Sequence, residues 1–352
     1  MSRRQWPKLR RWVLVYLLAV GLVAGPAYTM YVHYDFSHSR DARSYLSMAR
    51  GEFSGIRITH RYRVLVPAAA AAVAWPLQKV YPHIWPHRAT SEWPTRLGFY
   101  LVNTLLMGAV GLVLFQTCLL YEATPAAAAL AVVAVLSSRW AVYISGLPLI
   151  DSLYLLVFAL GFYGARSGSA LALAACLVLG PLAKESFVFL VPWLLLFGRP
   201  ALGWPRQLAW LALGGALAYG VRFWVDSRIG APPAESVQNA LAHLENLTYS
   251  LRRLFSVKGA GEIFSIFGVF SLALLAGWQG PRAWWRTLGW PGLGLVVVVA
   301  VHMLLSGDLG RMGYLLAPAF AVAFSLVLSR QPLFQWLQDT TFQALVKQPA
   351  DS

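Results

Sequence analysis

Long apolar runs separated by short polar segments dominate this chain of 352 residues. The first run extends from Trp12 to about Val32, and about 20 apolar residues are enough for a helix to cross a membrane. Comparable runs recur along the whole chain, and none shows the strict alternation typical of strands. We predict an all-α integral membrane protein, with a polytopic bundle of about 10–12 membrane segments in one transmembrane domain over residues 1–352.

Basic residues orient these predicted spans. Arg3, Arg4, Lys8, Arg10 and Arg11 precede the first run, and short loops rich in Lys and Arg stay on the cytoplasmic side. We therefore expect the N-terminus inside the cell and residues 32–63 outside, as a first outer loop.

The remaining runs give an order of crossings. A second span is expected over 64–81, which places 82–96 in the cytoplasm, and a third over 97–121. A short run, 125–136, and a broken or partial span over 140–150 then bring Asp151 to the outer face. Seven further runs follow, over 151–165, 170–183, 186–197, 208–225, 263–278, 288–305 and 312–328.

Two later segments are expected outside this regular alternation. Residues 226–262 form an outer loop, and residues 330–352 form a cytoplasmic tail. The outer loop contains an apolar rhythm of three to four residues that predicts an amphipathic helix lying in the membrane interface. The apolar positions of that helix are Val237, Leu241, Leu244, Leu251, Leu254 and Phe255.

Composition supports the membrane assignment. Hydrophobic residues make up 58% of the chain and charged residues 12%, whereas soluble domains contain about 25% charged residues. The net charge of +15 comes mostly from short loops, so we expect contact with membrane lipid and not with nucleic acid. Cys118 and Cys176 both lie inside apolar runs and indicate no disulfide framework.

Nine ionisable residues share one layer in this topology, at the outer ends of spans or in the first outer loop. Insertion of such a group at membrane depth costs about 2.5–3.5 kcal/mol of free energy, so the presence of each one requires an explanation. Ordinary interfacial placement explains any one of them, but the set mixes acids with bases while the inner loops are cationic. The nine are Asp35, Asp41, Arg61, Arg63, Asp151, Lys184, Glu185, Asp308 and Arg311.

The first outer loop contains the most specific pattern. Asp41, Tyr45, Met48 and Ala49 would share one side of a short helix that ends at Gly51. A carboxylate at the mouth of a cavity can act as a general base toward an acceptor hydroxyl.

Two arginines close the same loop. Arg61 and Arg63, at the top of the expected second span, could bind a phosphate at headgroup depth. The alternative for both is ordinary snorkelling toward the interface.

These motifs resemble the GT-C superfamily of polytopic glycosyltransferases, in particular bacterial members that use polyprenyl-phosphate-linked sugars. The resemblance rests on Asp41-x3-Tyr45-x2-Met48-Ala-x-Gly51 and on Arg61-Tyr-Arg63-x-Leu-x-Pro67. It extends through short motifs to Pro148-Leu-Ile-Asp151, Gly180-Pro-Leu-Ala-Lys-Glu185 and Asp308-x2-Arg311.

The resemblance implies sugar transfer to a lipid, a glycan or another acceptor at the extracytoplasmic face of a bacterial inner membrane. Asp41 would be the catalytic residue, with Asp35 as the substitute. The donor phosphate would be bound by Arg61, Arg63, Lys184 and Arg311. Substrate would be oriented by Tyr45, His60, Asp151, Glu185 and Asp308. No cofactor is expected; a divalent ion between Asp35 and Asp41 stays open, although no pattern demands one.

Other functions remain open at this point. A transporter or flippase would place its charged site near the bilayer midplane, often between repeated halves, and no repeat is visible. A polysaccharide polymerase or ligase with a diphosphate-linked donor would use a similar outer cavity. A non-enzymatic assembly factor would leave the mixture of acids and bases unexplained.

Overall fold

The computed structural model describes the backbone of residues 6–35, 39–88, 92–230, 236–280 and 283–334, all of it helical or irregular, with no strand in these ranges. Helices of the first half are α1 (Trp6–His33), α2 (Arg40–Ala49), α3 (Ile58–Arg61), α4 (Leu65–Ile84), η1 (Pro86–Arg88), α5 (Glu92–Leu120), α6 (Pro125–Leu136), α7 (Arg139–Gly146), α8 (Asp151–Ser167) and α9 (Ala170–Ala183).

The second half is equally helical. Its helices are η2 (Glu185–Phe189), α10 (Val191–Phe197), α11 (Trp204–Ile229), α12 (Ser236–Leu254), α13 (Val257–Phe267), α14 (Phe270–Ala276), α15 (Trp284–Ser306), α16 (Leu309–Gly313), η3 (Tyr314–Leu316), α17 (Ala317–Arg330) and η4 (Pro332–Phe334).

The chain is a helical membrane protein by the length and composition of these helices. Among the described residues, five helices are long and apolar enough to cross a membrane, and two bent pairs raise the number to seven. This count is lower than the predicted 10–12 segments, in part because α9 and the η2–α10 unit are apolar but shorter than a full crossing.

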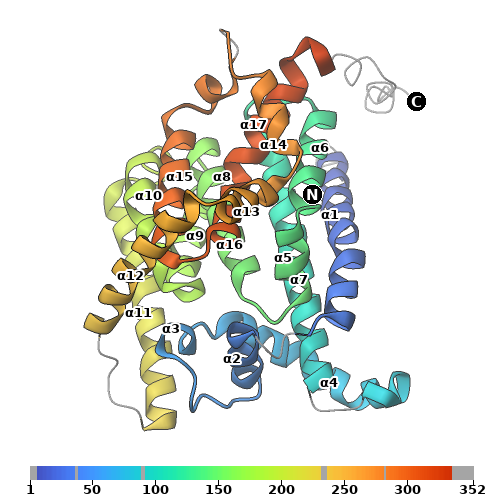
Figure 1. Cartoon of the computed structure of the whole chain (residues 1–352), viewed down its shortest axis with the longest axis vertical. Helices are drawn as coiled ribbons and strands as arrows, with labels where there is room; N and C mark the ends of the chain where they lie inside the picture. The colour runs from blue at the N-terminus through green and yellow to red at the C-terminus, as the bar shows by residue number, and fades with distance from the viewer. Residues whose placement is uncertain (1–5, 36–38, 89–91, 231–235, 281–282, 335–352) are drawn as a thin grey trace.

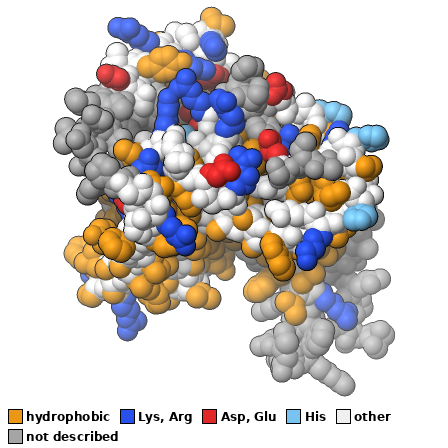
Figure 2. All heavy atoms as spheres, turned by 90° about the horizontal axis from the view of Figure 1, so that it is seen from below, with side chains coloured by type: hydrophobic (Ala, Val, Ile, Leu, Met, Phe, Trp, Pro, Cys, Tyr) orange, Lys and Arg blue, Asp and Glu red, His pale blue; other side chains and the backbone are white. Residues whose placement is uncertain are grey.

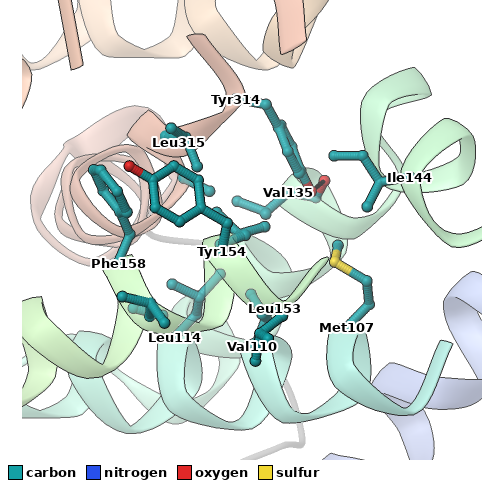
Figure 3. Close-up of a cluster of buried hydrophobic side chains, with 14 of the residues drawn as sticks. Met107, Val110, Leu114, Val135, Ile144, Leu153, Tyr154, Phe158, Tyr314 and Leu315 are labelled. Carbon is teal, nitrogen blue, oxygen red and sulfur yellow. Dashed lines mark hydrogen bonds between the residues drawn. The ribbon is translucent and has the colours of Figure 1, made fainter. Parts of the chain in front are cut away.

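The centre of the bundle is the continuous unit of α16, η3 and α17, which α5, α6 and α8 surround. Buried side chains from these elements lie against one another in a common core (Figure 3). The labelled residues from these elements are Met107, Val110, Leu114, Val135, Leu153, Tyr154, Phe158, Tyr314 and Leu315, and Ile144 of α7 joins them.

The expected second span, 64–81, is wrong. Both ends of α4 lie at the same end of the bundle: Arg63, just before it, pairs with Glu185, and Tyr81 hydrogen-bonds to Tyr31 at the end of α1 over 2.9 Å. Arg96 Nη2 also donates to the Tyr31 carbonyl, so the start of α5, which was expected at the cytoplasmic end, lies at this end too. Figure 1 shows α4 below the bundle, beside α2.

The expected separate spans over 125–136 and 140–150 are wrong as well. Helices α6 and α7 form one bent unit with an angle of 62° between them. Thr124, before α6, bonds to Ser329 at the end of α17, whereas Gly146, at the end of α7, lies against Ala27 and Met30. One broken span therefore replaces two, and because α4 is also lost as a crossing, Asp151 still reaches the α2 end.

Short helices then place polar residues below the outer end of the bundle. Helix α9 has 14 residues and rises about 21 Å, less than the hydrocarbon core of about 30 Å. Helices α1 and α11, with 28 and 26 residues, extend farther toward α2. Residues that follow α9 therefore lie deeper in the bundle than the ends of α1 and α11, and α2 and α3 lie beyond them at this end of the bundle (Figure 1).

The predicted outer helix exists as α12, but it does not lie free in the interface. It packs against α15, where Asn246 Nδ2 lies 3.4 Å from the Leu305 carbonyl. Leu251 and Phe255 are exposed, whereas Leu254 is partly buried. The side chains of Val237, Leu241 and Leu244, like nearly all of the 330–352 tail, lie outside the described residues.

Candidate active site

Acidic and basic side chains meet at the α2 end of the bundle, which Figure 2 shows as adjoining patches in the middle of that face. Helix α2 supplies the first of them. Ser39 caps it by accepting a hydrogen bond from the Ala42 amide, which places Asp41 in the first turn and Tyr45 one turn later on the same face. Gly51 adopts φ +80° just beyond the helix, as the pattern predicted for its end.

Arg311 lies at the centre of the cluster. Its Nη1 is 2.8 Å from Asp41 Oδ2 and 3.5 Å from Asp151 Oδ2, and its Nε is 3.0 Å from Asp308 Oδ2. Asp308 also caps α16 by accepting from the Arg311 amide. One guanidinium thus joins three carboxylates from the first loop, α8 and the start of α16.

Asp151 and Lys184 form the buried floor of the site. Lys184 Nζ lies 3.3 Å from Asp151 Oδ1, 3.2 Å from Met312 Sδ and 5.4 Å from the centre of the Tyr154 ring. The Asp151 side chain is only 5% exposed, so its charge depends on Lys184 and Arg311 as partners.

A buried amide holds the chain break that presents Asp151. Asn103 on α5 donates to the carbonyls of Leu147 and Leu149 over 3.1 and 3.0 Å and accepts from Ser152. Non-helical backbone at membrane depth requires such partners, because lipid supplies none.

A second ion pair lies above the floor. Arg63 Nε is 2.9 Å from Glu185 Oε2, and Arg63 Nη1 donates to the Tyr45 hydroxyl over 3.0 Å. His60 Nε2 lies 3.5 Å from Asp41 Oδ1, with its ring against that of Tyr45. The first loop is therefore connected to η2 as well as to Arg311.

The groups of the first loop are tuned by this packing. Burial raises the pKa of Asp41, but Arg311 and His60 outweigh it and hold that pKa below its usual value. Burial lowers the pKa of His60, and it raises the pKa of Tyr45 to about 12. At neutral pH, Asp41 is thus a carboxylate beside a neutral histidine, which is the form a general base requires.

The cluster has no surplus of positive charge. Four carboxylates, Asp41, Asp151, Glu185 and Asp308, face three cations, Arg63, Lys184 and Arg311. An anionic ligand must therefore exchange with a carboxylate partner or arrive with its own counter-charge.

Two predicted site residues lie elsewhere. Arg61 Nη2 donates to the Ile56 carbonyl over 2.9 Å, within its own loop, so Arg61 is not part of the cluster. Asp35 lines a separate pocket with Arg43 and Arg96, beside the face of α2 opposite Asp41. The two carboxylates considered for a shared divalent ion are thus on different sides of α2, and the described residues contain no group of three or more metal-ligand side chains.

Sequence reasoning missed the part of the site that α11 forms. An apolar groove of about 460 Å³ lies between the η2–α10 unit and α11, lined for most of its length by Pro181, Val188, Val191, Leu211, Gly215 and Ala218. Glu185 and Arg222 also line it, and Glu185 is the partner of Arg63. The signal was present in the sequence as an arginine inside the apolar run 208–225.

The outer end of α11 is fastened to the first loop. Tyr62 OH donates to Asp226 over 2.9 Å, Arg222 lies over the Tyr62 ring at 5.0 Å, and Phe53 packs edge-on against Trp224. Through these three contacts the first loop lies against α11 beside the groove, as it also lies against the cluster.

Comparisons of the chain with protein-family models, with curated proteins and with solved structures give no match. The resemblance to GT-C glycosyltransferases therefore depends on the short sequence motifs alone.

Proposed function

We propose that this protein is a membrane glycosyltransferase that moves a sugar from a polyprenyl-phosphate carrier to a hydroxyl of a lipid or glycan acceptor at the α2 face. The observation that carries the proposal is the adjacency of the apolar groove to the charged cluster, through Glu185 and Arg63. A ligand with a long apolar chain and a phosphorylated sugar matches both parts.

The groove favours a lipid-linked donor over a water-soluble one. Its walls are apolar side chains along α10 and α11, and its charged residues, Glu185 and Arg222, belong to the end nearest the first loop. A polyprenyl chain in the groove would lie at membrane depth, with its phosphate near Arg222 and Arg63.

Asp41 is the proposed general base. Its side chain is 27% exposed, and among the carboxylates of the cluster it alone combines contact with Arg311 and His60 with access from outside. In the reaction, the acceptor oxygen bonds to the anomeric carbon of the donor sugar, and its proton passes to Asp41. The bond from that carbon to the phosphate oxygen breaks, and the carrier leaves as its phosphate.

The cations are proposed to stabilise the departing phosphate. Arg311 and Arg63 already have carboxylate partners, so phosphate binding would replace one paired oxygen by another and leave no cation unpaired. Release of Arg311 from Asp41 would at the same time raise the basicity of Asp41, because the guanidinium is what holds its pKa low.

A transfer assay tests the proposal. Purified protein in vesicles receives radiolabelled polyprenyl-phosphate sugars and a lipid extract as acceptor, and labelled product is counted. Asp41→Asn should lower the turnover by about 10²–10⁴-fold, with donor binding retained and the protein still folded at the assay temperature.

The matched control is Glu52→Gln, since Glu52 is also a carboxylate of the first loop but lies outside the cluster, 57% exposed and 3.3 Å from Arg50. Its turnover at saturating substrate should stay within about twofold of the unmodified protein. Equal loss in both variants, or transfer that survives Asp41→Asn, would overturn the assignment of the base. Sugar translocation without any transfer would identify a flippase.

A further inference from the structure

Helix α2 has two polar faces, and only one of them belongs to the cluster. Asp41 and Tyr45 point toward Arg311 and Arg63. Arg43, Ser47 and Arg50 lie on the opposite face, since residues of an α-helix follow one another by about 100°. The opposite face therefore requires an explanation of its own.

This opposite face forms one wall of a second pocket, of about 330 Å³, which we call the α2 back pocket. The end of α1 and the start of α5 form its other walls. Its charged and hydroxyl-bearing residues are Tyr34, Asp35, Arg43, Ser47, Arg50, Glu92 and Arg96.

Three arginines line this pocket, and their guanidinium groups differ in how many contacts hold them in place. Arg96 is fixed, because its guanidinium stacks 4.0 Å from the Trp93 ring centre and donates to the Tyr31 carbonyl. Arg50 Nη2 lies 3.3 Å from Glu52 and 3.5 Å from Ser47 Oγ. Arg43 is exposed and makes no ion pair with any residue that the structure describes.

The balance of charge in the back pocket differs from that of the cluster. Three guanidiniums there face the two lining carboxylates Asp35 and Glu92, and Arg50 is also paired with Glu52 outside the lining. Arg43 is therefore the cation of the pocket that has no ion pair with a described residue. Guanidinium forks match the oxygens of phosphate and carboxylate groups, and carboxylates accept hydrogen bonds from sugar hydroxyls. The combination fits a hydroxylated anion.

We propose that the α2 back pocket binds the anionic group, a phosphate or a carboxylate, of the acceptor. That the ligand is the acceptor depends on the proposed function, whereas the anion site is inferred from the residues of the pocket alone. Most of the described residues that line the pocket are charged or polar, in contrast to the groove proposed for the polyprenyl donor, and the pocket lies about one helix diameter, or about 10 Å, from Asp41. The reactive hydroxyl should therefore be separated from the anionic group by more than one sugar ring.

Thiol labelling tests the anion site without any activity. Ser47→Cys places a thiol in the back pocket, and the two native cysteines, Cys118 and Cys176, are buried and should not react. The rate of alkylation by a membrane-impermeant maleimide is measured in detergent with glycerol phosphate or with glucose, and in vesicles of phosphatidylglycerol or phosphatidylcholine.

We expect an anion to slow the labelling at least about threefold, with no effect of glucose or phosphatidylcholine. Slowing by glycerol phosphate identifies a site for a free anionic group, and slowing by phosphatidylglycerol alone identifies a lipid headgroup. Arg43→Gln with Arg50→Gln in the Ser47→Cys background should abolish the effect. Labelling that neither anion slows would overturn the proposal.

Kinetics then distinguish a failure of this proposal from a failure of the proposed function. Arg43→Gln with Arg50→Gln should raise the acceptor KM about tenfold and leave kcat within about twofold, in contrast to Asp41→Asn. If an anion protects the Ser47→Cys thiol but the protein has no transferase activity, the anion site is supported and the proposed transferase function is contradicted. If the enzyme is active, the acceptor KM is unchanged and anions do not affect the labelling, the proposed role of the back pocket is contradicted while the transferase function is not.

Discussion

The cations of the charged cluster and four cations at the opposite end of the bundle are held in different ways. At the α2 end, Arg63, Lys184 and Arg311 are largely buried and paired with carboxylates. At the other end, exposed arginines lie over aromatic rings: Arg11 over Phe115, Arg166 over Tyr121, Arg199 over Trp204 and Arg286 over Trp285. No described residue forms an ion pair with these four.

The difference separates two uses of positive charge in a membrane protein. Exposed arginines with ring contacts suit the headgroup layer, where water and lipid phosphate satisfy the charge and the excess of basic residues sets orientation. Recessed cations with protein carboxylates have to be satisfied within the fold, and a ligand can enter only by exchange of partners. The site is therefore expected at the paired end.

The largest expected effect on stability comes from removal of a buried partner. Asp151→Asn keeps the shape of the side chain but leaves Lys184 and Arg311 with less negative charge at a buried position. We expect a loss of about 3–5 kcal/mol in the free energy of unfolding, measured by denaturant titration in detergent.

The control for Asp151→Asn is Glu52→Gln. The Arg50–Glu52 pair has the same separation of 3.3 Å as Lys184–Asp151, but Glu52 is 57% exposed. Its loss should cost less than about 1 kcal/mol. Similar effects of the two substitutions would remove the distinction between buried and exposed pairs.

A substitution in the groove tests whether the donor belongs to the paired end. A Cβ on Gly215 meets no atom within 4 Å, so Gly215→Phe should fold while it fills the groove. The donor KM should rise at least about tenfold, equivalent to about 1.4 kcal/mol, with the acceptor KM unchanged.

Gly220→Phe is the matched control, because Gly220 is also open and lies outside the groove. A rise in donor KM for both variants would mean that the added ring disturbs α11 in general. No rise for either would place the lipid chain elsewhere.

Acidification should act on the paired end in two steps. The pKa of His60 is lower in the folded protein than its usual 6.5, so the unfolded chain binds that proton first and stability falls below pH 6.5. The pKa of Asp41 is also lowered, so its contribution is present above pH 3.8 and lost as pH falls further. Melting curves of His60→Gln should lack the first step, and a curve that retains it would contradict this origin.

The smallest effect is expected at the unpaired end. Arg166→Gln removes a guanidinium that lies 4.6 Å from the Tyr121 ring centre and is exposed. A contact of this kind contributes about 0.5–1 kcal/mol, so the melting temperature should shift by a few degrees at most and transfer should persist. A loss of transfer as large as that of Asp41→Asn would indicate that the active site lies at the Arg166 end and would contradict the proposal.

The layer of charges could be predicted from the sequence, because ionisable residues at the ends of apolar runs are visible without a structure. Helix α2 could also be predicted, since Asp41 and Tyr45 recur at helical spacing before Gly51. Which carboxylate pairs with which cation could not, because Arg311 is 270 residues from Asp41 and the contact depends on the path of every helix between them.

The two errors in topology have a common physical cause. Apolarity measures burial from water, not the direction of a helix, so the Ala-rich α4 and the bent α6–α7 unit both resembled upright spans. The first error counted α4 as a crossing, and the second counted the single α6–α7 crossing as two. Because two surplus crossings cancel in direction, the later helices run in the expected direction. Arg61 and Asp35 were misplaced because position in a loop does not fix the side from which a side chain enters a site.

Thiol labelling from the two sides of the membrane tests whether the charged cluster lies on the outer face. Single cysteines at positions 41, 308 and 166 are labelled by a membrane-impermeant maleimide added to intact cells. Asp41 and Asp308 are 27% and 34% exposed, so Asp41→Cys and Asp308→Cys should react from outside, and Arg166→Cys only after the membrane is opened. Labelling of position 166 from outside, or of position 41 without position 308, would contradict a single charged site on the outer face.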